Sequence, residues 1–100
     1  MNVTGMGPYI KRNGAFKIMI QGTGFARGDS VKVDIKVGST TTSRTGTVLL
    51  PVTGGCIAKI DPHFASEKDE VYDEDLAEVT ITVTSATGTT DSATEPGIQE

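Results

Sequence analysis

The chain has one cysteine, one histidine, no tryptophan and only five aromatic residues. The lone Cys56 excludes an intrachain disulfide and a metal site built on a pair of cysteines. So few aromatic side chains also argue against the stacking platforms of sugar-binding modules. The sequence has no apolar run of about 18 residues and no basic segment leading into an apolar one. We therefore expect no membrane span, no signal peptide and synthesis in the cytoplasm.

Basic residues are few and scattered. Nine Lys and Arg face 13 Asp and Glu, which gives a net charge of −4 at pH 7. No basic stripe could neutralise a phosphate backbone, so we expect no nucleic-acid partner. The 100 residues suit one ordinary domain, and a content of 36% hydrophobic and 22% charged residues is typical of a chain that folds.

What the sequence does have is a period of two. In segments 15–21, 30–37 and 78–85, apolar residues alternate with polar ones and many are β-branched, which predicts half-buried β-strands. Shorter stretches separated by Gly-rich turns predict four more strands, at 8–11, 45–50, 56–60 and 88–93. Seven short strands predict an all-β fold, namely a sandwich of antiparallel strands.

One helical signal interrupts this pattern. Asp61 is a good N-cap and Pro62 suits the first helical position, so we expect a short helical turn near residues 62–70. The Gly-containing start and the polar end are predicted to lie outside the sandwich. The predicted organisation is an N-terminal arm at 1–8, the sandwich at 9–92 and a flexible C-terminal tail at 93–100.

Two stretches resemble immunoglobulin-type domains. Residues 13–33, NGAFKIMIQGTGFARGDSVKV, are similar to the opening of the IPT/TIG family, in which a Gly-x-Gly-Phe turn separates two strands. Residues 79–94, VTITVTSATGTTDSAT, resemble the last hairpin of that family, and residues 75–81 have the spacing with which intermediate-set domains enter their sixth strand. The resemblance implies an immunoglobulin-like β-sandwich. It puts aliphatic residues where the family has its two cysteines, core tryptophan and corner tyrosine: Ile20, Ile81, Val33 and Val79.

The tripeptide Arg27-Gly28-Asp29 matches the cell-attachment motif of integrin ligands, in which the Asp carboxylate binds a metal on the integrin. Gly and Asp are also favoured turn residues, and the IPT/TIG-like pattern places a turn before the strand at 30–37. We prefer the turn interpretation, with Phe25 packing into the core. Arg27 alone then has no structural role, which makes it a candidate contact residue.

Seven carboxylates crowd into residues 67–78, with only Lys68 opposing them. Oxygen ligands of this kind hold Ca²⁺, and Asp69, Asp73 and Asp75 are the candidate ligands. The ordered Asp-x-Asp-x-Asp-Gly spacing of a calcium loop is missing. We therefore prefer a solvated, self-repelling loop that could dock on a basic partner, and we predict no cofactor.

Catalysis needs a nucleophile, a base and a group that orients them. His63 lies at the expected helix start, and Cys56 lies in an expected strand, where apolar surroundings raise a thiol pKa instead of lowering it. Gly22, Gly24 and Gly28 lead into a strand and not a helix, so they do not form a dinucleotide-binding loop. We therefore expect no enzyme activity.

The expected function is structural. A small, acidic, disulfide-free domain of this kind fits a virion protein, namely a phage capsid decoration or cement protein that is homo-oligomeric or bound to a lattice of capsid protein. The alternative is an adhesion or carbohydrate-binding module of a larger cell-surface protein. Candidate contact residues lie in the arm, the loop tips and the acidic segment: Met1, Val3, Met6, Tyr9, Arg27 and Tyr72.

Overall fold

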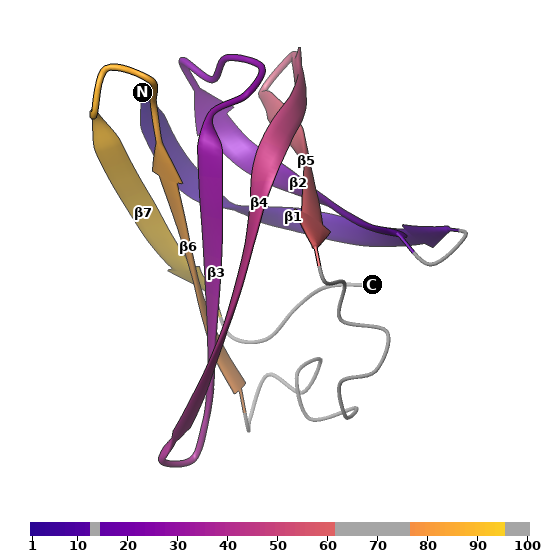
Figure 1. Cartoon of the computed structure of the whole chain (residues 1–100), viewed down its shortest axis with the longest axis vertical. Helices are drawn as coiled ribbons and strands as arrows, with labels where there is room; N and C mark the ends of the chain where they lie inside the picture. Colours follow the sequence, from indigo (N-terminus) through magenta and orange to yellow (C-terminus); the bar gives the residue numbers. More distant parts are fainter. Residues whose placement is uncertain (13–14, 62–76, 96–100) are drawn as a thin grey trace.

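The computed structural model describes residues 1–12, 15–61 and 77–95, and of residues 6–12, 15–16, 37, 61 and 77 it describes the backbone alone. This part of the chain forms seven β-strands (Figure 1), which confirms all seven predicted strands and lengthens most of them. It contains no helix, and the helical turn expected near 62–70 lies outside the described ranges. The strands are β1 (Asn2–Arg12), β2 (Ala15–Thr23), β3 (Ser30–Val37), β4 (Thr40–Val52), β5 (Gly55–Asp61), β6 (Ala77–Thr84) and β7 (Thr90–Glu95).

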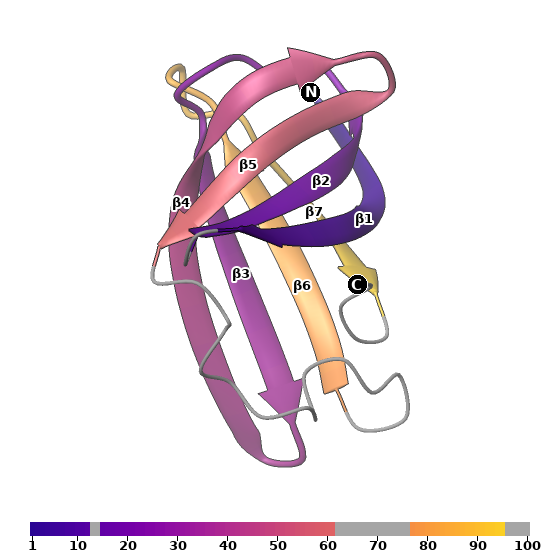
Figure 2. The ribbon, with the colours of Figure 1, turned by 90° about the vertical axis from the view of Figure 1, so that its right-hand side faces the viewer.

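All seven strands belong to one sheet, in the order β1-β2-β5-β4-β3-β6-β7. The long strand β4 makes the sheet continuous, because residues 40–47 pair with β3 while residues 45–52 pair with β5. Strands β1, β2 and β5 therefore cross over β3, β6 and β7, as Figure 2 shows. Two separate sheets were predicted, and the structure corrects this to a single antiparallel sheet curled into a nearly closed barrel.

The barrel is open between β1 and β7. Six successive antiparallel pairings separate these two strands, so they run in the same direction. No backbone ladder joins them in the described ranges. Instead, the Val3 amide donates a hydrogen bond to Asp91 Oδ2 at 2.6 Å. A Cβ added to Gly5 would lie 2.6 Å from Glu95 Oε1, so the second carboxylate of β7 also approaches β1.

The core follows directly from the period of two. Inward positions of five strands carry aliphatic side chains or a thiol, and each side chain that becomes fully buried contributes roughly 1.5–3 kcal/mol to folding. Cys56 is among them, as predicted. The buried hydrophobic residues on these strands are Ile18, Ile20, Val31, Val33, Ile35, Val48, Cys56, Ala58, Ile60, Val79, Ile81 and Val83.

The structure corrects the predicted arm and the first three residues of the predicted tail. Residues 2–8 belong to β1, which pairs with β2, and Val3 is only 5% exposed because it faces the core. The pairing has irregularities between Val3 and Gly5 and between Met6 and Tyr9, and the second irregularity contains Gly7 and Pro8. Residues 93–95 likewise belong to β7, and 96–100 lie outside the described ranges.

Gly46 sits where β4 passes from one half of the sheet to the other. It pairs with Val31 on β3 and with Ile60 on β5. A Cβ at this position would overlap the backbone carbonyl of Lys59. Glycine is therefore required here by the close approach of β5, and not by an unusual backbone angle.

Candidate docking surface

The structure separates the predicted contact residues. Arg27 is exposed, whereas Val3 is buried and Met1 is half-buried and packs against the core. Val3 was predicted as a partner anchor, and that prediction is wrong because β1 turns this side chain inward. Only the backbone of Met6 and Tyr9 is described, and Tyr72 lies outside the described ranges.

The Arg27-Gly28-Asp29 segment is a turn fastened to the barrel. Asp29 is only 4% exposed, and its Oδ2 accepts the Ala26 amide hydrogen at 2.8 Å. The Gly28 amide donates to the Val48 carbonyl at 2.8 Å, and the Val48 amide donates to the Asp29 carbonyl at 2.9 Å. Gly28 has φ 90°, which favours glycine. The buried carboxylate cannot reach a metal on another protein, so the geometry supports the turn interpretation.

Cys56 lies fully buried on β5. Burial, and second the nearby Asp29 carboxylate, raise the pKa of its thiol to about 11, against a smaller lowering by a hydrogen bond with the Ile20 backbone. A thiol in this state is protonated at neutral pH and shielded from reagents. It is a core side chain and a poor nucleophile.

The remaining predicted sites lie elsewhere. The candidate calcium ligands Asp69, Asp73 and Asp75, and also His63, fall in 62–76, outside the described ranges. Among the residues that are described, no three His, Cys, Asp or Glu side chains are grouped so as to hold a metal ion. In the same part of the chain, no helix has the length and apolarity needed to cross a membrane.

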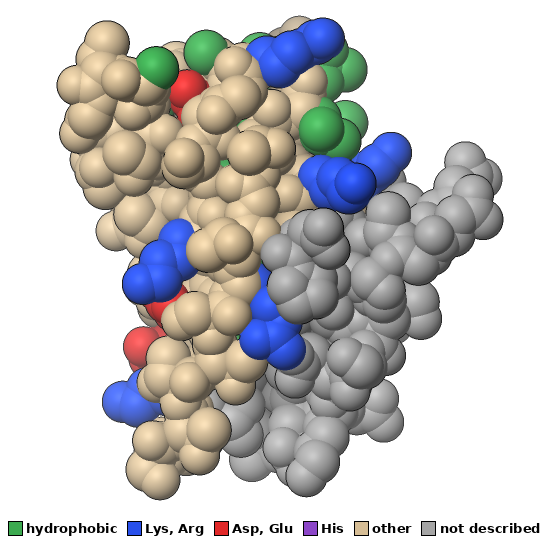
Figure 3. Space-filling model, in the orientation of Figure 1, with side chains coloured by type: hydrophobic (Ala, Val, Ile, Leu, Met, Phe, Trp, Pro, Cys, Tyr) green, Lys and Arg blue, Asp and Glu red, His purple; other side chains and the backbone are tan. Residues whose placement is uncertain are grey.

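One outer face of the barrel is covered by hydroxyl side chains. This hydroxyl face spans the first half of β4 together with β3, β6 and β7, and it is the mostly tan surface towards the viewer in Figure 3. Its side chains bind one another: Thr80 and Thr94 share a hydrogen bond of 3.0 Å, and Thr84 and Thr90 share one of 3.2 Å. Its Ser and Thr residues, taken from the strand registers, are Ser30, Thr41, Ser43, Thr45, Thr47, Thr80, Thr82, Thr84, Thr90, Ser92 and Thr94.

The charges on the hydroxyl face are compensated locally. Lys32 Nζ lies 3.8 Å from Asp34 Oδ1, and the Ser43 hydroxyl donates to the same carboxylate. Lys36 stands directly opposite Glu78 across the β3–β6 ladder. Polar groups that satisfy each other in this way offer little to a partner.

The outer face of β2, β5 and the second half of β4 is different. Met19 stands opposite Ile57, and Ile57 stands opposite Leu50, so three apolar side chains form a row across three strands. We call these three residues the apolar row. Met19 and Ile57 are half-buried, and Leu50 is 45% exposed, which makes it the large exposed hydrophobic side chain of the described residues.

A bulge brings Leu50 to this row. Val48 faces the core opposite Ala58, and regular alternation would place Leu49 outward and Leu50 inward. The register shifts between Val48 and Leu50, so Leu49 is the extra residue and Leu50 comes opposite Ile57. The sequence did not reveal this position because the pairing of β4 with β5 decides it.

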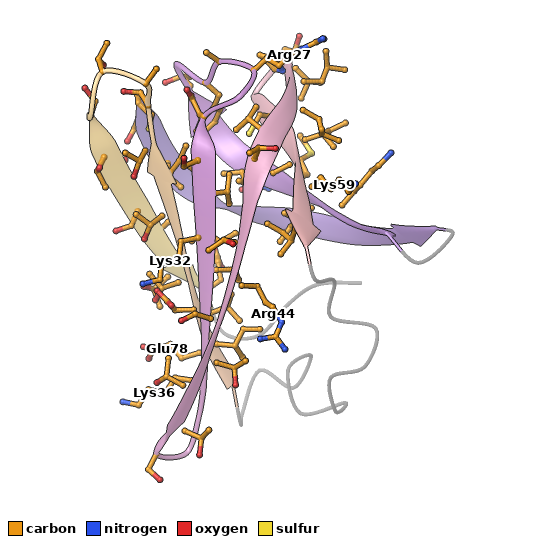
Figure 4. The ribbon with its side chains drawn as sticks, in the orientation of Figure 1. Arg27, Lys32, Lys36, Arg44, Lys59 and Glu78 are labelled. Carbon is orange, nitrogen blue, oxygen red and sulfur yellow. The ribbon has the colours of Figure 1, made fainter. Side chains whose placement is uncertain are left out.

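Cations flank the apolar row on both sides. Lys17 and Lys59 are both exposed and stand opposite each other in the next row of the β2–β5 ladder. Arg27 extends from the turn at the other side of the row, and Figure 4 labels Arg27 and Lys59 at these two positions. In Figure 3, hydrophobic side chains lie between the two cationic groups at the upper right. We call the apolar row with Lys17, Lys59 and Arg27 the docking face.

Sequence reasoning found Arg27 but missed the rest of the docking face. Met19 shares the outward face of its strand with Lys17, but its position in the sequence does not show that it stands opposite Ile57. The available signal was an apolar residue at an outward position of two strands, 15–21 and 56–60, but only the β2–β5 pairing makes them neighbours.

Comparison of the chain with protein-family models, with curated proteins and with solved structures finds no match.

Proposed function

We propose that the chain is a non-enzymatic assembly module that binds a protein partner through the docking face, as a decoration or cement protein of a virus capsid. The observation that carries this proposal is the apolar row with its exposed Leu50. Exposed aliphatic side chains gathered on a sheet face lose contact with water when a partner covers them. The neighbouring hydroxyl face, whose groups bind one another, provides no such gain.

The strand order supports an immunoglobulin-like fold for this module. In constant-type immunoglobulin domains the first, second, fifth and fourth strands form one sheet, and the third, sixth and seventh form the other. The order found here is β1-β2-β5-β4 followed by β3-β6-β7, with an added β4–β3 pairing that joins the two sets. This order agrees with the resemblance of residues 13–33 and 79–94 to IPT/TIG and intermediate-set domains.

The small size of the docking face favours a repetitive partner. Its three partly exposed aliphatic side chains and three cations are far fewer than the roughly 20–30 residues that each partner contributes to a standard stable interface. Such a contact is weak when made once. On a capsid, or in an oligomer placed on a capsid symmetry axis, many copies bind at the same time and the avidity rises by orders of magnitude.

Co-sedimentation tests the proposal. The tagged chain and its variants Leu50→Ser and Thr82→Ala would be made in the cells that express it natively, and virus particles would be pelleted from the lysates. We expect the wild type and the Thr82→Ala control to pellet with particles and Leu50→Ser to lose about tenfold of the bound fraction. Absence of the wild-type chain from purified particles, or equal binding by all three proteins, would contradict the proposal.

A further inference from the structure

We infer that the partner surface covered by the docking face is an acidic protein segment, in which carboxylates flank aliphatic side chains; this inference rests on the proposed function. The first observation is the Lys17–Lys59 pair. Like charges directly opposite each other in an antiparallel ladder repel, so this pair weakens the free domain. Carboxylates of a partner would relieve that repulsion on binding.

The charge distribution of the described strands gives the second observation. Among β1, β2, β4 and β5, the one acidic residue is Asp61, the last of β5, which lies two positions beyond Lys59 and away from the apolar row. The other described carboxylates lie on β3, β6 and β7 or are buried, as Asp29 is. The docking face is therefore locally cationic on a chain whose net charge is −4.

A second copy of the chain is a poor occupant. Cations lie on both sides of the apolar row, so two docking faces stacked on each other bring cations close to cations. Within the described ranges, Asp34, Glu78, Asp91 and Glu95 belong to the other half of the barrel, and Asp61 lies at the end of β5 away from the apolar row, so these carboxylates are poorly placed to compensate the cations. Charge complementarity therefore selects a different, acidic surface.

Anionic lipids and nucleic acids fit the geometry less well. The apolar row lies on the body of a sheet and contains no aromatic residue, whereas lipid-binding surfaces insert protruding or amphipathic apolar elements into the headgroup region. Three cations separated by aliphatic side chains also do not follow a phosphate backbone. An extended acidic segment with aliphatic side chains matches both parts of the docking face.

A titration with defined probes tests the inference. The ¹⁵N-labelled chain would be titrated with a peptide of alternating Asp and Leu, with a peptide of alternating Lys and Leu, and with vesicles of phosphatidylcholine and phosphatidylserine. The readout is the shift of the backbone amide resonances of Met19, Ile57 and Lys59, compared with those of Thr82 and Thr94 on the hydroxyl face.

We expect the acidic peptide to shift the docking-face amides and to bind about three- to tenfold more weakly at high salt than at low salt. Lys59→Glu should weaken this binding by a similar factor. Lys32→Glu, a matched change on the hydroxyl face, should leave it unchanged. Equal binding of the Lys-Leu peptide, equal effects of the two substitutions, or a preference for vesicles would overturn the inference. Dimerisation of the free chain through the docking face, seen by sedimentation velocity, would also overturn it.

The two proposals fail in different ways. If the chain is absent from virus particles but the acidic peptide binds the docking face, the proposed virion role fails and the inference about an acidic partner stands. If Leu50→Ser releases the chain from particles but neither salt nor Lys59→Glu affects the contact, the assembly role stands and the acidic partner is wrong.

Discussion

The hydroxyl face and the docking face are two outward surfaces of one sheet, and they differ in whether their side chains already have partners. On the hydroxyl face, Thr80 binds Thr94 and Lys32 lies beside Asp34. On the docking face, Leu50 is 45% exposed and Lys17 stands opposite Lys59, a like charge. Several side chains of the hydroxyl face are already paired in the free chain, whereas the docking face gains favourable contacts only when a partner covers it. The difference teaches that outward position alone does not identify a binding surface.

The largest expected effect is a loss of stability on substitution of Gly46, where the two halves of the sheet meet. Gly46→Val would place side-chain atoms on the Lys59 carbonyl, where β4 passes from one half of the sheet to the other. Because backbone atoms cannot move aside, we expect a loss of roughly 4 kcal/mol or more in the free energy of unfolding, measured by urea denaturation. Gly38→Ala is the control, since it has φ 63° but no atom within 4 Å of an added Cβ, and it should cost only about 1 kcal/mol. A mild effect of Gly46→Val would contradict the described crossing.

A matched pair on β5 distinguishes the inner from the outer surface. Ile60 is 1% exposed, whereas Ile57 faces outward in the apolar row. Ile60→Ala should cost about 2–5 kcal/mol in the free energy of unfolding because it leaves a cavity in the core. Ile57→Ala should cost less than about 1 kcal/mol but weaken binding of the acidic peptide. Equal losses of stability would show that Ile57 belongs to the core and not to the docking face.

The next largest loss of stability is expected in the turn that contains Arg27. Asp29→Ala removes the acceptor of the Ala26 amide from a buried position, and we expect a loss of about 1–3 kcal/mol in the free energy of unfolding. Arg27→Ala should change stability by less than about 0.5 kcal/mol and act on partner binding alone. Thermal and urea denaturation would check both variants. A neutral Asp29→Ala would contradict the stabilising role of this hydrogen bond.

Cys56 reports on the strand that carries the docking face. Its pKa is raised from 9.0 to about 11 on folding, so above pH 9 the unfolded chain binds fewer protons than the folded one. This contribution therefore lowers stability as pH rises from 9 to 11, by roughly 1 kcal/mol at pH 10. The measurement is the pH dependence of unfolding, compared with that of Cys56→Ala to cancel other titrating groups. A parallel pair of curves would contradict the buried, protonated thiol.

The smallest expected effects are changes in the free energy of unfolding when one lysine on each face is replaced by glutamate, and the two changes have opposite signs. Lys59→Glu replaces a like-charge pair with an ion pair opposite Lys17, and should raise the free energy of unfolding by about 0.2–1 kcal/mol while weakening binding. Lys32→Glu removes the ion pair with Asp34 and should lower it by a few tenths of a kcal/mol. Both effects should shrink in high salt. Stability changes of the same sign would contradict the proposed electrostatic difference between the two faces.

The local sequence pattern predicted the seven strands of the fold. Alternation in 30–37 and 78–85 predicted the inward side chains of β3 and β6, and turn chemistry predicted the role of Gly28. The double pairing of β4 was not predictable, because a period of two defines a strand's faces but not its neighbours. The assignment of residues 2–8 failed for a related reason: bulges allow a segment with Gly5, Gly7 and Pro8 to pair with β2.

Most of the docking face could not be predicted for the same reason, because strand pairing decides which of its residues are neighbours. Arg27 could be identified from its own segment, since nothing in the turn uses its side chain. Leu50 could not, because its outward direction depends on the bulge at Leu49. The Lys17–Lys59 repulsion likewise exists only once β2 and β5 are neighbours. Long-range pairing, and not composition, creates the surface that we propose as functional.

Site-specific photo-crosslinking tests the central claim most directly. A benzophenone amino acid would replace Leu50 in one version of the chain and Thr82 in another, each expressed in the native cells and irradiated. We predict that the version with the probe at position 50 forms an adduct with a capsid protein, at about tenfold the yield of the version with the probe at position 82. Equal yields at the two positions, or an adduct confined to position 82, would contradict the docking face.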